Sequence, residues 1–221
     1  MKTEIKTTND GSVTLYVPEL NEHYHSIHGA VTESMHVFVN AGLKHCRKKT
    51  VRILEVGFGT GLNAILTFMH REDKHIEYVA VEKYPLDIEM VDKLNYSAYL
   101  RLNEYQQEIF YRFHHQSWGT GNSVAPGFML VKINEAIHDT GLNGLFDVVY
   151  FDAFAPGVQP EMWTMDVFQK IYRCMNLNGI LVTYCAKGVV RRTMQSTGYR
   201  VERLPGPPGK REMLRAVKIE Q

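Results

Sequence analysis

Short apolar runs alternate along the chain with longer segments in which apolar residues recur every three or four positions. The first pattern predicts β-strands, and the second predicts helices that bury one face. We expect strands at residues 12–17, 51–56, 76–82, 128–133, 147–152, 180–185, 199–204 and 212–219. We expect helices at residues 28–43, 61–70, 85–95, 99–113, 134–138, 160–175 and 188–197.

This alternation predicts an α/β protein whose mostly parallel sheet is covered by helices on both faces. Two strands close the chain, and a hairpin between them would make the final strand antiparallel. Residues 114–123 have the composition of a loop. A chain of 221 residues, 44% of them apolar, can bury one sizeable core. We therefore expect a single domain over residues 1–221, in which an N-terminal extension (1–48) packs on a core (49–221).

A glycine-rich turn follows the strand predicted at 51–56. It reads Glu55-Val56-Gly57-Phe58-Gly59-Thr60-Gly61, and Glu82 closes the next predicted strand. The glycines let the backbone turn sharply and approach a ligand, and the following helix directs free N–H groups towards it. A carboxylate at Glu82 can accept hydrogen bonds from two ribose hydroxyls. The pairing predicts a site for an adenosine-containing cofactor.

The spacing of the glycines separates two classes of cofactor. Dinucleotides favour G-x-G-x-x-G, whereas here the third glycine comes one residue early and no Lys or Arg lies nearby to hold a pyrophosphate. Glu-Val-Gly-x-Gly-x-Gly is typical of class I S-adenosyl-L-methionine (SAM) methyltransferases, whose cofactor has no phosphate. A glycine turn without a ligand is the alternative, but three alternating glycines weaken a fold unless something requires them.

Composition narrows the protein class. Charged residues make up 22%, and no apolar run reaches the ~18 residues of a membrane span. Residues 1–6 lack the apolar segment of a signal peptide. The three cysteines share no C-x-x-C spacing, which favours a reducing compartment over a disulfide framework. We expect a cytoplasmic protein that does not bind a membrane.

The net charge of +1 conceals a basic C-terminal segment. Residues 187–218 contain nine Lys or Arg but only two Glu, so the rest of the chain is net acidic. A basic surface of this kind suits a partner rich in phosphates, and a solvated surface without a partner is the alternative. We expect the basic residues to form one face.

The segment after the strand at 147–152 carries the candidate acceptor site. Asp152 ends an apolar run and is followed by Phe154 and Pro156. Ligands of parallel sheets bind beyond the carboxyl ends of the strands, where these three residues would form a half-rigid wall. The alternative is that Asp152 caps a helix and Phe154 packs in the core.

Two other features have simpler explanations. His23, His25 and His28 resemble metal ligands, but no carboxylate or thiolate stands at ligand spacing, so we expect no metal. Cys185 ends a strand, and we expect a buried apolar cysteine there rather than a nucleophile.

Over about residues 10–217 the chain resembles the methyltransferase domain of the MnmC family. The resemblance rests on the D-x-F-x-P-x-x-x-P-x-x-W motif of residues 152–163, on residues 184–192, on Lys210-Arg211-Glu212-Met213, and on an opening segment at 22–38. It implies a class I SAM-dependent methyltransferase fold, a Rossmann-like sheet with an antiparallel final strand and an added N-terminal segment.

The resemblance also implies an activity, the SAM-dependent N-methylation of 5-aminomethyl-2-thiouridine to 5-methylaminomethyl-2-thiouridine at the tRNA wobble position. We expect a stand-alone form without the flavin oxidase domain, so that a separate enzyme supplies the aminomethyl nucleoside. Two alternatives stay open. One is a methyltransferase for a small-molecule or protein amine, which the basic segment argues against. The other is a SAM- or RNA-binding module without catalysis, which the presence of both Glu82 and Asp152 argues against.

We assign roles to site residues on this basis. Asp152 is the expected catalytic residue, which orients the amine and accepts its proton. Cofactor contacts are expected from Glu55, Gly57, Gly59, Gly61, Asn63, Glu82, Asn134 and Asp152. Asn134 is assigned to the adenine because Lys132, where family members often carry an acid, cannot accept a hydrogen bond. Substrate contacts are expected from Tyr24, Ser26, Phe154 and Pro156, with Lys187, Arg191, Arg192, Lys210 and Arg211 on the phosphates of the anticodon loop. Trp163 is expected in the core.

Overall fold

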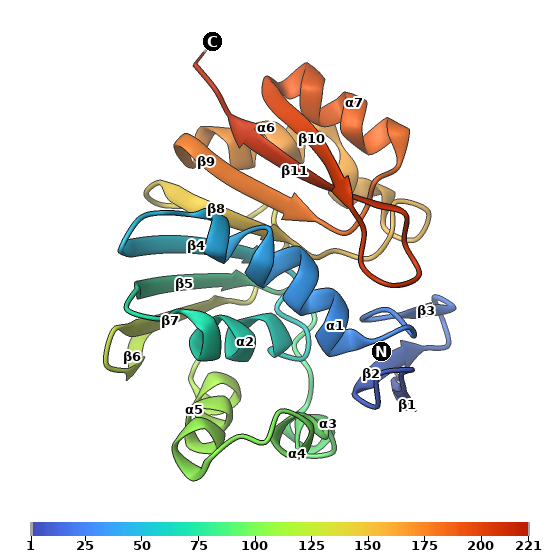
Figure 1. The fold of residues 1–221 in the computed structure, drawn as a ribbon, viewed down its shortest axis with the longest axis vertical. Coiled ribbons are helices and arrows are strands. Elements are labelled where there is room, and N and C mark those ends of the chain that lie inside the picture. Colours follow the sequence, from blue (N-terminus) through green and yellow to red (C-terminus); the bar gives the residue numbers. More distant parts are fainter. Residues whose placement is uncertain (1, 221) are drawn as a thin grey trace.

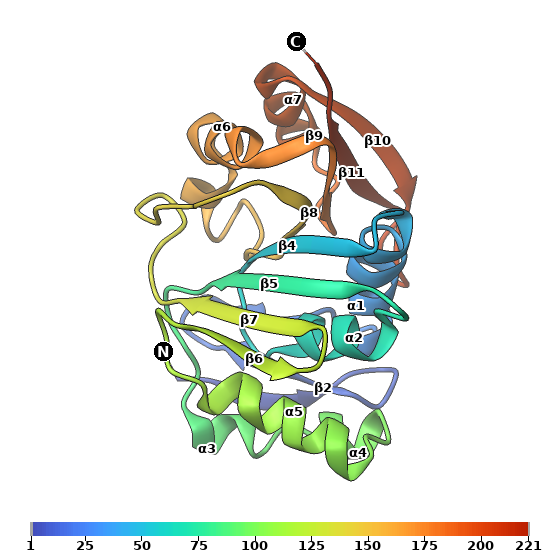
Figure 2. The same ribbon diagram turned by 90° about the vertical axis from the view of Figure 1, so that its left-hand side faces the viewer.

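The structure, a computed structural model, describes residues 2–220 and is built around an eight-stranded sheet. The strand order is β10-β11-β9-β8-β4-β5-β7-β6, and Figure 2 shows the strands one above another down to β6. The parallel centre consists of β4 (Thr50–Val56), β5 (His75–Val81), β7 (Phe128–Ile133), β8 (Phe146–Phe151) and β9 (Met175–Thr183).

Antiparallel strands close both edges of this sheet. At one edge, β11 (Glu212–Lys218) runs antiparallel to both β9 and β10 (Tyr199–Pro205). At the other edge, β6 (Gly121–Ala125) pairs antiparallel with β7. The expected α/β fold with an antiparallel final strand is therefore confirmed.

Helices cover both faces, because alternate residues of each central strand point to opposite sides. Ile53 of β4 packs on one face beneath α2 (Leu62–His70) and α5 (Glu104–His115). Leu54 packs on the other face beneath α6 (Met165–Arg173) and α7 (Gly188–Thr197). Both residues are fully buried, which explains why β4 has apolar residues on both of its faces rather than a strict alternation of apolar and polar positions.

The N-terminal segment forms a small second sheet, β1 (Glu4–Thr7), β2 (Val13–Val17) and β3 (Glu22–His23). Figure 1 shows it beside the ends of the parallel strands, followed by a helical segment along the main sheet. That segment is α1 (Ala30–Ser34), a π-helix η1 (Met35–Asn40) and a short 3₁₀ turn η2 (Leu43–His45). Leu15 and Phe38 bury their side chains in the core shared with α2 and α5.

Three expected elements differ from the structure. Residues 85–95, which were expected to form one helix, contain only the short helix α3 (Ile88–Val91). Outside this range, α4 (Tyr96–Tyr99) and η3 (Pro160–Trp163) are also single turns. Residues 134–138 form no helix but a bend and the start of a turn, where the Asn134 side chain donates to the backbone oxygens of Glu82 and Lys83. The expected loop at 114–123 contains the start of β6, whose polar, exposed residues give no strand pattern and are held by pairing with β7.

None of the helices in the part of the chain that the structure describes combines the length and apolar character needed to cross a membrane.

Candidate functional site

The carboxyl ends of the parallel strands open onto a cavity of about 500 Å³. Its wall combines residues from the loops after β4, β5, β7 and β8 with residues from the N-terminal sheet and from η3. They include Glu19, Tyr24, His25, Gly57, Gly59, Glu82, Glu135, Ile137, Asp152, Phe154, Gln159, Glu161 and Tyr184. The N-terminal segment thus completes a site that the main sheet begins.

The glycine turn allows three elements to approach each other. Gly57 has φ 93°, and a Cβ there would lie 2.4 Å from the backbone oxygen of Asp152. Gly61 has φ 70°, begins α2, and leaves room for the ring of His114. Because L side chains rarely adopt these dihedrals and lack the space, glycine is required by the packing of β4 against β8 and α5.

Glu82 is held on the cavity wall by backbone donors. Its Oε2 accepts from the N–H of Gly59 at 3.0 Å, and its Oε1 accepts from the N–H of Tyr84 at 2.8 Å. Burial raises the pKa of Glu82, whereas these bonds act in the opposite direction. Each carboxylate oxygen keeps a further lone pair for a ligand hydroxyl.

Asp152 shares one amide group with a second carboxyl. The Nδ2 of Asn63 donates to Oδ2 of Asp152 at 2.8 Å and to Oε1 of Glu55 at 2.9 Å. Burial raises the pKa of Glu55 well above its usual range. Burial, together with the charge of Glu33, raises the pKa of Asp152 to about 7, against the opposing effects of Asn63 and Lys210. Asp152 can therefore exchange a proton near neutral pH.

Aromatic side chains form the outer wall. The rings of Tyr24 and Phe154 meet edge to face with centroids 5.2 Å apart. Behind them, the indole N–H of Trp163 donates to the backbone oxygen of Phe154 at 2.8 Å. Trp163 is buried against Phe151, as expected for a core residue, and fixes the loop that carries Phe154.

Of the predicted site residues, the cavity wall contains Tyr24, Gly57, Gly59, Glu82, Asp152 and Phe154. Within residues 2–220, its lining does not include Ser26, Glu55, Gly61, Asn63, Asn134 or Pro156. Glu55 and Asn63 support Asp152 from behind. The amide hydrogens of Asn134 tie the loop after β5, so an adenine contact by this residue stays a prediction.

Lys132 points away from the cavity. Its ammonium donates to the backbone oxygen of His114 at 2.9 Å and lies 4.6 Å from the centre of the Trp118 ring. Burial lowers its pKa to about 8. Lys132, which stands where members of the MnmC family often carry an acid, therefore packs beneath α5 and does not contribute to the cavity wall.

Several wall residues were not identified from the sequence. Glu19, Glu135 and Gln159 stand in loops whose pattern carries no signal for a site. Tyr184 lies within the quoted 184–192 motif, which was the one available indication; its hydroxyl donates to the backbone oxygen of Ala153 at 2.8 Å.

The prediction that the basic residues of 187–218 form one face is wrong. Lys218 pairs in register with Tyr199 at the start of β10, and Arg200 lies there beside Lys48, at the end of the strands opposite the cavity. Strand β10 forms one edge of the sheet and runs from that end towards the cavity, so its charges are separated along the strand. Lys187, at the start of α7, and Arg211, before β11, are exposed near the cavity edge.

Other basic residues are paired with acids. Arg215 binds Glu202 at 2.8 Å, and Arg203 lies 3.6 Å from Glu212. Lys210 is half-buried in an ion pair with Glu33. The structure thus gives Lys210 an internal partner where a phosphate contact was expected.

His25 and Cys185 are buried, whereas His23 is partly exposed and His28 is exposed. Burial lowers the pKa of His25 to about 4, so its ring is neutral. Within the described residues, no group of three or more His, Cys, Asp or Glu side chains is arranged to hold a metal ion. Cys185 is a buried free thiol whose pKa is raised by burial.

Comparisons with known proteins show which proteins this chain resembles. A family model described as S-adenosyl-L-methionine-dependent methyltransferase matches residues 111–219. The chain is 30% identical to the tRNA 5-methylaminomethyl-2-thiouridine biosynthesis bifunctional protein MnmC of Cupriavidus metallidurans, over 93% of this chain and 32% of that protein. The MnmC protein of Pseudoalteromonas atlantica is 29% identical, over 97% of this chain and 33% of its own length.

A solved structure agrees with these relatives. The crystal structure of MnmC2 from Aquifex aeolicus superposes with a TM-score of 0.79 at 28% identity, covering 97% of this chain and 70% of that one. The chain spans about a third of the length of the curated relatives it matches.

Proposed function

We propose that this chain, which belongs to the S-adenosyl-L-methionine-dependent methyltransferases and corresponds to the methyltransferase part of MnmC proteins, methylates the primary amine of 5-aminomethyl-2-thiouridine at the tRNA wobble position. The observation that carries the proposal is Asp152, a carboxyl with a pKa of about 7 on the same cavity wall as Glu82. The names of the relatives give the product, 5-methylaminomethyl-2-thiouridine of tRNA, and the resemblance to the MnmC family implies its aminomethyl precursor as the substrate.

The cavity fits the cofactor. Its volume of about 500 Å³ is in the usual range for a ligand of this size. Glu82 offers free lone pairs to the two ribose hydroxyls, while Gly57 and Gly59 leave space for the methionine part. When bound, SAM supplies an activated methyl group on a sulfonium centre, and the protein supplies alignment and electrostatics.

Asp152 is proposed to act on the acceptor. An alkylamine resembling lysine has a pKa of about 10 and must lose a proton before its lone pair can attack. Asn63 holds Oδ2 of Asp152, which leaves Oδ1 to accept a hydrogen bond from the amine and then its proton. Tyr24 and Phe154 would stack on the extruded base, as splayed-out RNA bases are commonly bound.

The tRNA is proposed to lie across the end of the sheet where the cavity opens, at the carboxyl ends of the parallel strands. Lys187 and Arg192 are exposed there at the start of α7, with Arg191 between them and Arg211 on the neighbouring loop. These side chains would contact anticodon-loop phosphates, which contribute affinity without reading sequence.

The remaining parts of the proposal concern context. We treat residues 1–221 as one methyltransferase domain that acts in the cytoplasm. A separate enzyme would supply the aminomethyl nucleoside.

The test is incubation of the protein with labelled SAM and tRNA that carries 5-aminomethyl-2-thiouridine, followed by mass spectrometry of the nucleosides. We expect labelled 5-methylaminomethyl-2-thiouridine, and none with tRNA that lacks the aminomethyl group. Label that appears only in small amines or in protein would support the alternative methyltransferase class. Tight SAM binding without transfer to any of these would indicate a binding module.

A further inference from the structure

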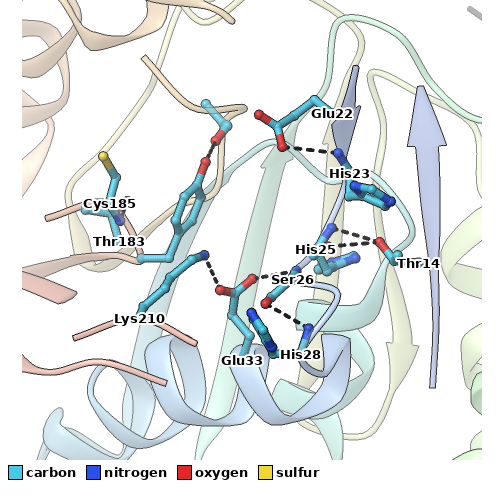
Figure 3. A network of polar contacts seen from close by, with 12 residues as sticks. Thr14, Glu22, His23, His25, Ser26, His28, Glu33, Thr183, Cys185 and Lys210 are labelled. Atoms are coloured by element: carbon cyan, nitrogen blue, oxygen red, sulfur yellow. Dashed lines mark hydrogen bonds and ion pairs between the residues drawn. The ribbon is translucent and has the colours of Figure 1, made fainter. Parts of the chain in front are cut away.

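A buried ion pair links the first helix to the last hairpin, next to Tyr184 of the cavity wall. Glu33 of α1 is 5% exposed, and its Oε1 accepts from the backbone N–H of Ser26 at 3.0 Å. Its other oxygen binds the ammonium of Lys210, which stands 177 positions away in the loop between β10 and β11. Figure 3 shows the two side chains pointing towards each other.

The pair reaches the cavity wall through Tyr184. The ammonium of Lys210 lies 3.9 Å from the centre of the Tyr184 ring. The Tyr184 hydroxyl donates to the backbone oxygen of Ala153, the residue after Asp152. His25, which also lines the cavity, is affected by the charges of both Glu33 and Lys210. One contact network therefore joins the ion pair to the end of β8.

Most groups around Asp152 are neutral. Asn63 of α2 is an amide, burial raises the pKa of Glu55 of β4 well above its usual range, and the pKa values of Tyr78, Tyr96 and Tyr184 are raised by burial. The charges that act on Asp152 are those of Glu33 and Lys210, with opposite signs. Glu82 lies on the same wall as Asp152, and its charge contributes to raising the pKa of Glu55.

We propose that Glu33 and Lys210 are positioning residues: their ion pair, which the Tyr184 ring connects to Ala153 next to Asp152, controls proton transfer at the acceptor site. Glu33 makes the carboxylate of Asp152 a stronger base, and Lys210 limits this effect so that the carboxylate form persists at neutral pH. A buried ion pair contributes little net stability compared with apolar packing, so stability alone does not account for it. The role of Asp152 as the proton acceptor rests on the proposed function.

The charges can be removed one at a time. Lys210→Met leaves Glu33 without a counter-charge, so the pKa of Asp152 should rise by about one unit. Glu33→Gln keeps a side chain that can accept from Ser26 but leaves Lys210 unopposed, so the pKa should fall by about one unit. The double variant should return close to the original value. Lys210→Arg keeps the charge and should also stay close to it.

Two readouts test this. The first is a ¹³C NMR titration of the Asp152 carboxyl in the free protein, assigned with Asp152→Asn. The second is the pH profile of single-turnover methylation. From a starting pKa of about 7, a rise of about one unit lowers the carboxylate fraction at pH 7 about fivefold, and a fall of about one unit raises it about 1.8-fold. Lys218→Met, at the end of the strands opposite the cavity, is the matched control and should shift neither readout.

Opposite shifts for the two single variants, with restoration in the double variant, would support the proposal. A purely structural pair predicts loss of activity without opposite shifts, and that result, or no shift, would overturn it. If Glu33→Gln does not fold, a rise in the pKa of Asp152 with Lys210→Met but not with Lys210→Arg would support the proposal, and the absence of a rise with Lys210→Met would overturn it. The NMR titration needs no substrate, so a failure to methylate tRNA would refute the proposed function without deciding this inference.

Discussion

Glu82 provides the sharpest test of the cofactor site, because the structure defines what its carboxylate holds. Replacement by Ala removes the acceptors of two proposed ribose hydroxyls and of the Gly59 and Tyr84 N–H groups. Hydrogen bonds to a charged group contribute about 1.5–3 kcal/mol. We expect Glu82→Ala to weaken SAM binding by about 1.5–3 kcal/mol, which is roughly 10- to 150-fold in Kd.

Glu82→Gln refines this prediction. The amide keeps one acceptor oxygen, but its NH₂ group must face either the Gly59 or the Tyr84 donor. Its affinity should therefore lie between those of the unmodified protein and Glu82→Ala. Because burial raises the pKa of Glu82, SAM affinity should fall as pH drops through that raised value, whereas the Gln variant should lack this dependence.

Isothermal titration calorimetry with SAM measures these effects across pH. Glu89→Gln, an exposed carboxyl on α3, is the control for loss of one negative charge. Unchanged affinity in both Glu82 variants would refute the assignment of the ribose to Glu82, and tight NAD binding by the unmodified protein would refute the cofactor class.

Three further predictions concern Asp152 and the basic surface. Asp152→Asn should reduce single-turnover methylation of tRNA by about 10²–10⁴-fold with little change in SAM affinity. If Asp152 acts mainly by orienting the amine rather than by accepting its proton, Asp152→Asn should retain more activity than Asp152→Ala. Near-normal turnover in both variants would remove Asp152 from the mechanism. Because the pKa of Asp152 is raised to about 7, the native state binds this proton more tightly than the unfolded chain, so the free energy of unfolding falls as pH rises from about 4 towards 7. At pH 8, denaturant unfolding should show Asp152→Asn to be more stable than the unmodified protein by up to about 4 kcal/mol. An equal or lower stability of the variant would contradict this. Replacing both Arg191 and Arg192 by Ala should weaken tRNA binding and reduce the slope of log affinity against log salt by roughly 0.7–0.9 per lost contact. Arg200→Ala, at the end of the strands opposite the cavity, is the control and should change neither. An unchanged slope in the double variant would count against the proposed surface.

Features that are determined by residues close together in the sequence could be predicted from the sequence alone. The turn at Gly57–Gly61 follows from glycine spacing after an apolar strand, and Glu82 follows the next strand by the same rule. Helix α7 was expected at 188–197 and has these bounds, because its apolar residues recur at helical spacing and Gly198 ends it in a left-handed conformation. The carboxyl ends of parallel strands meet at one edge, so these segments could be placed around one site in advance.

Features that join distant segments required the tertiary structure. Strand β6 is held by its pairing with β7, and its own polar residues indicate a loop. The ion pair of Glu33 with Lys210 joins two distant segments and cannot be recognised from a sequence pattern. It gives Lys210 an internal partner, although its charge alone had suggested a phosphate contact. The pKa of Asp152 depends on burial and on charges from α1 and the last hairpin, while Asn63 links it to Glu55. Sequence patterns report which face of an element is apolar, whereas electrostatic surroundings depend on distances between elements that only the folded chain determines.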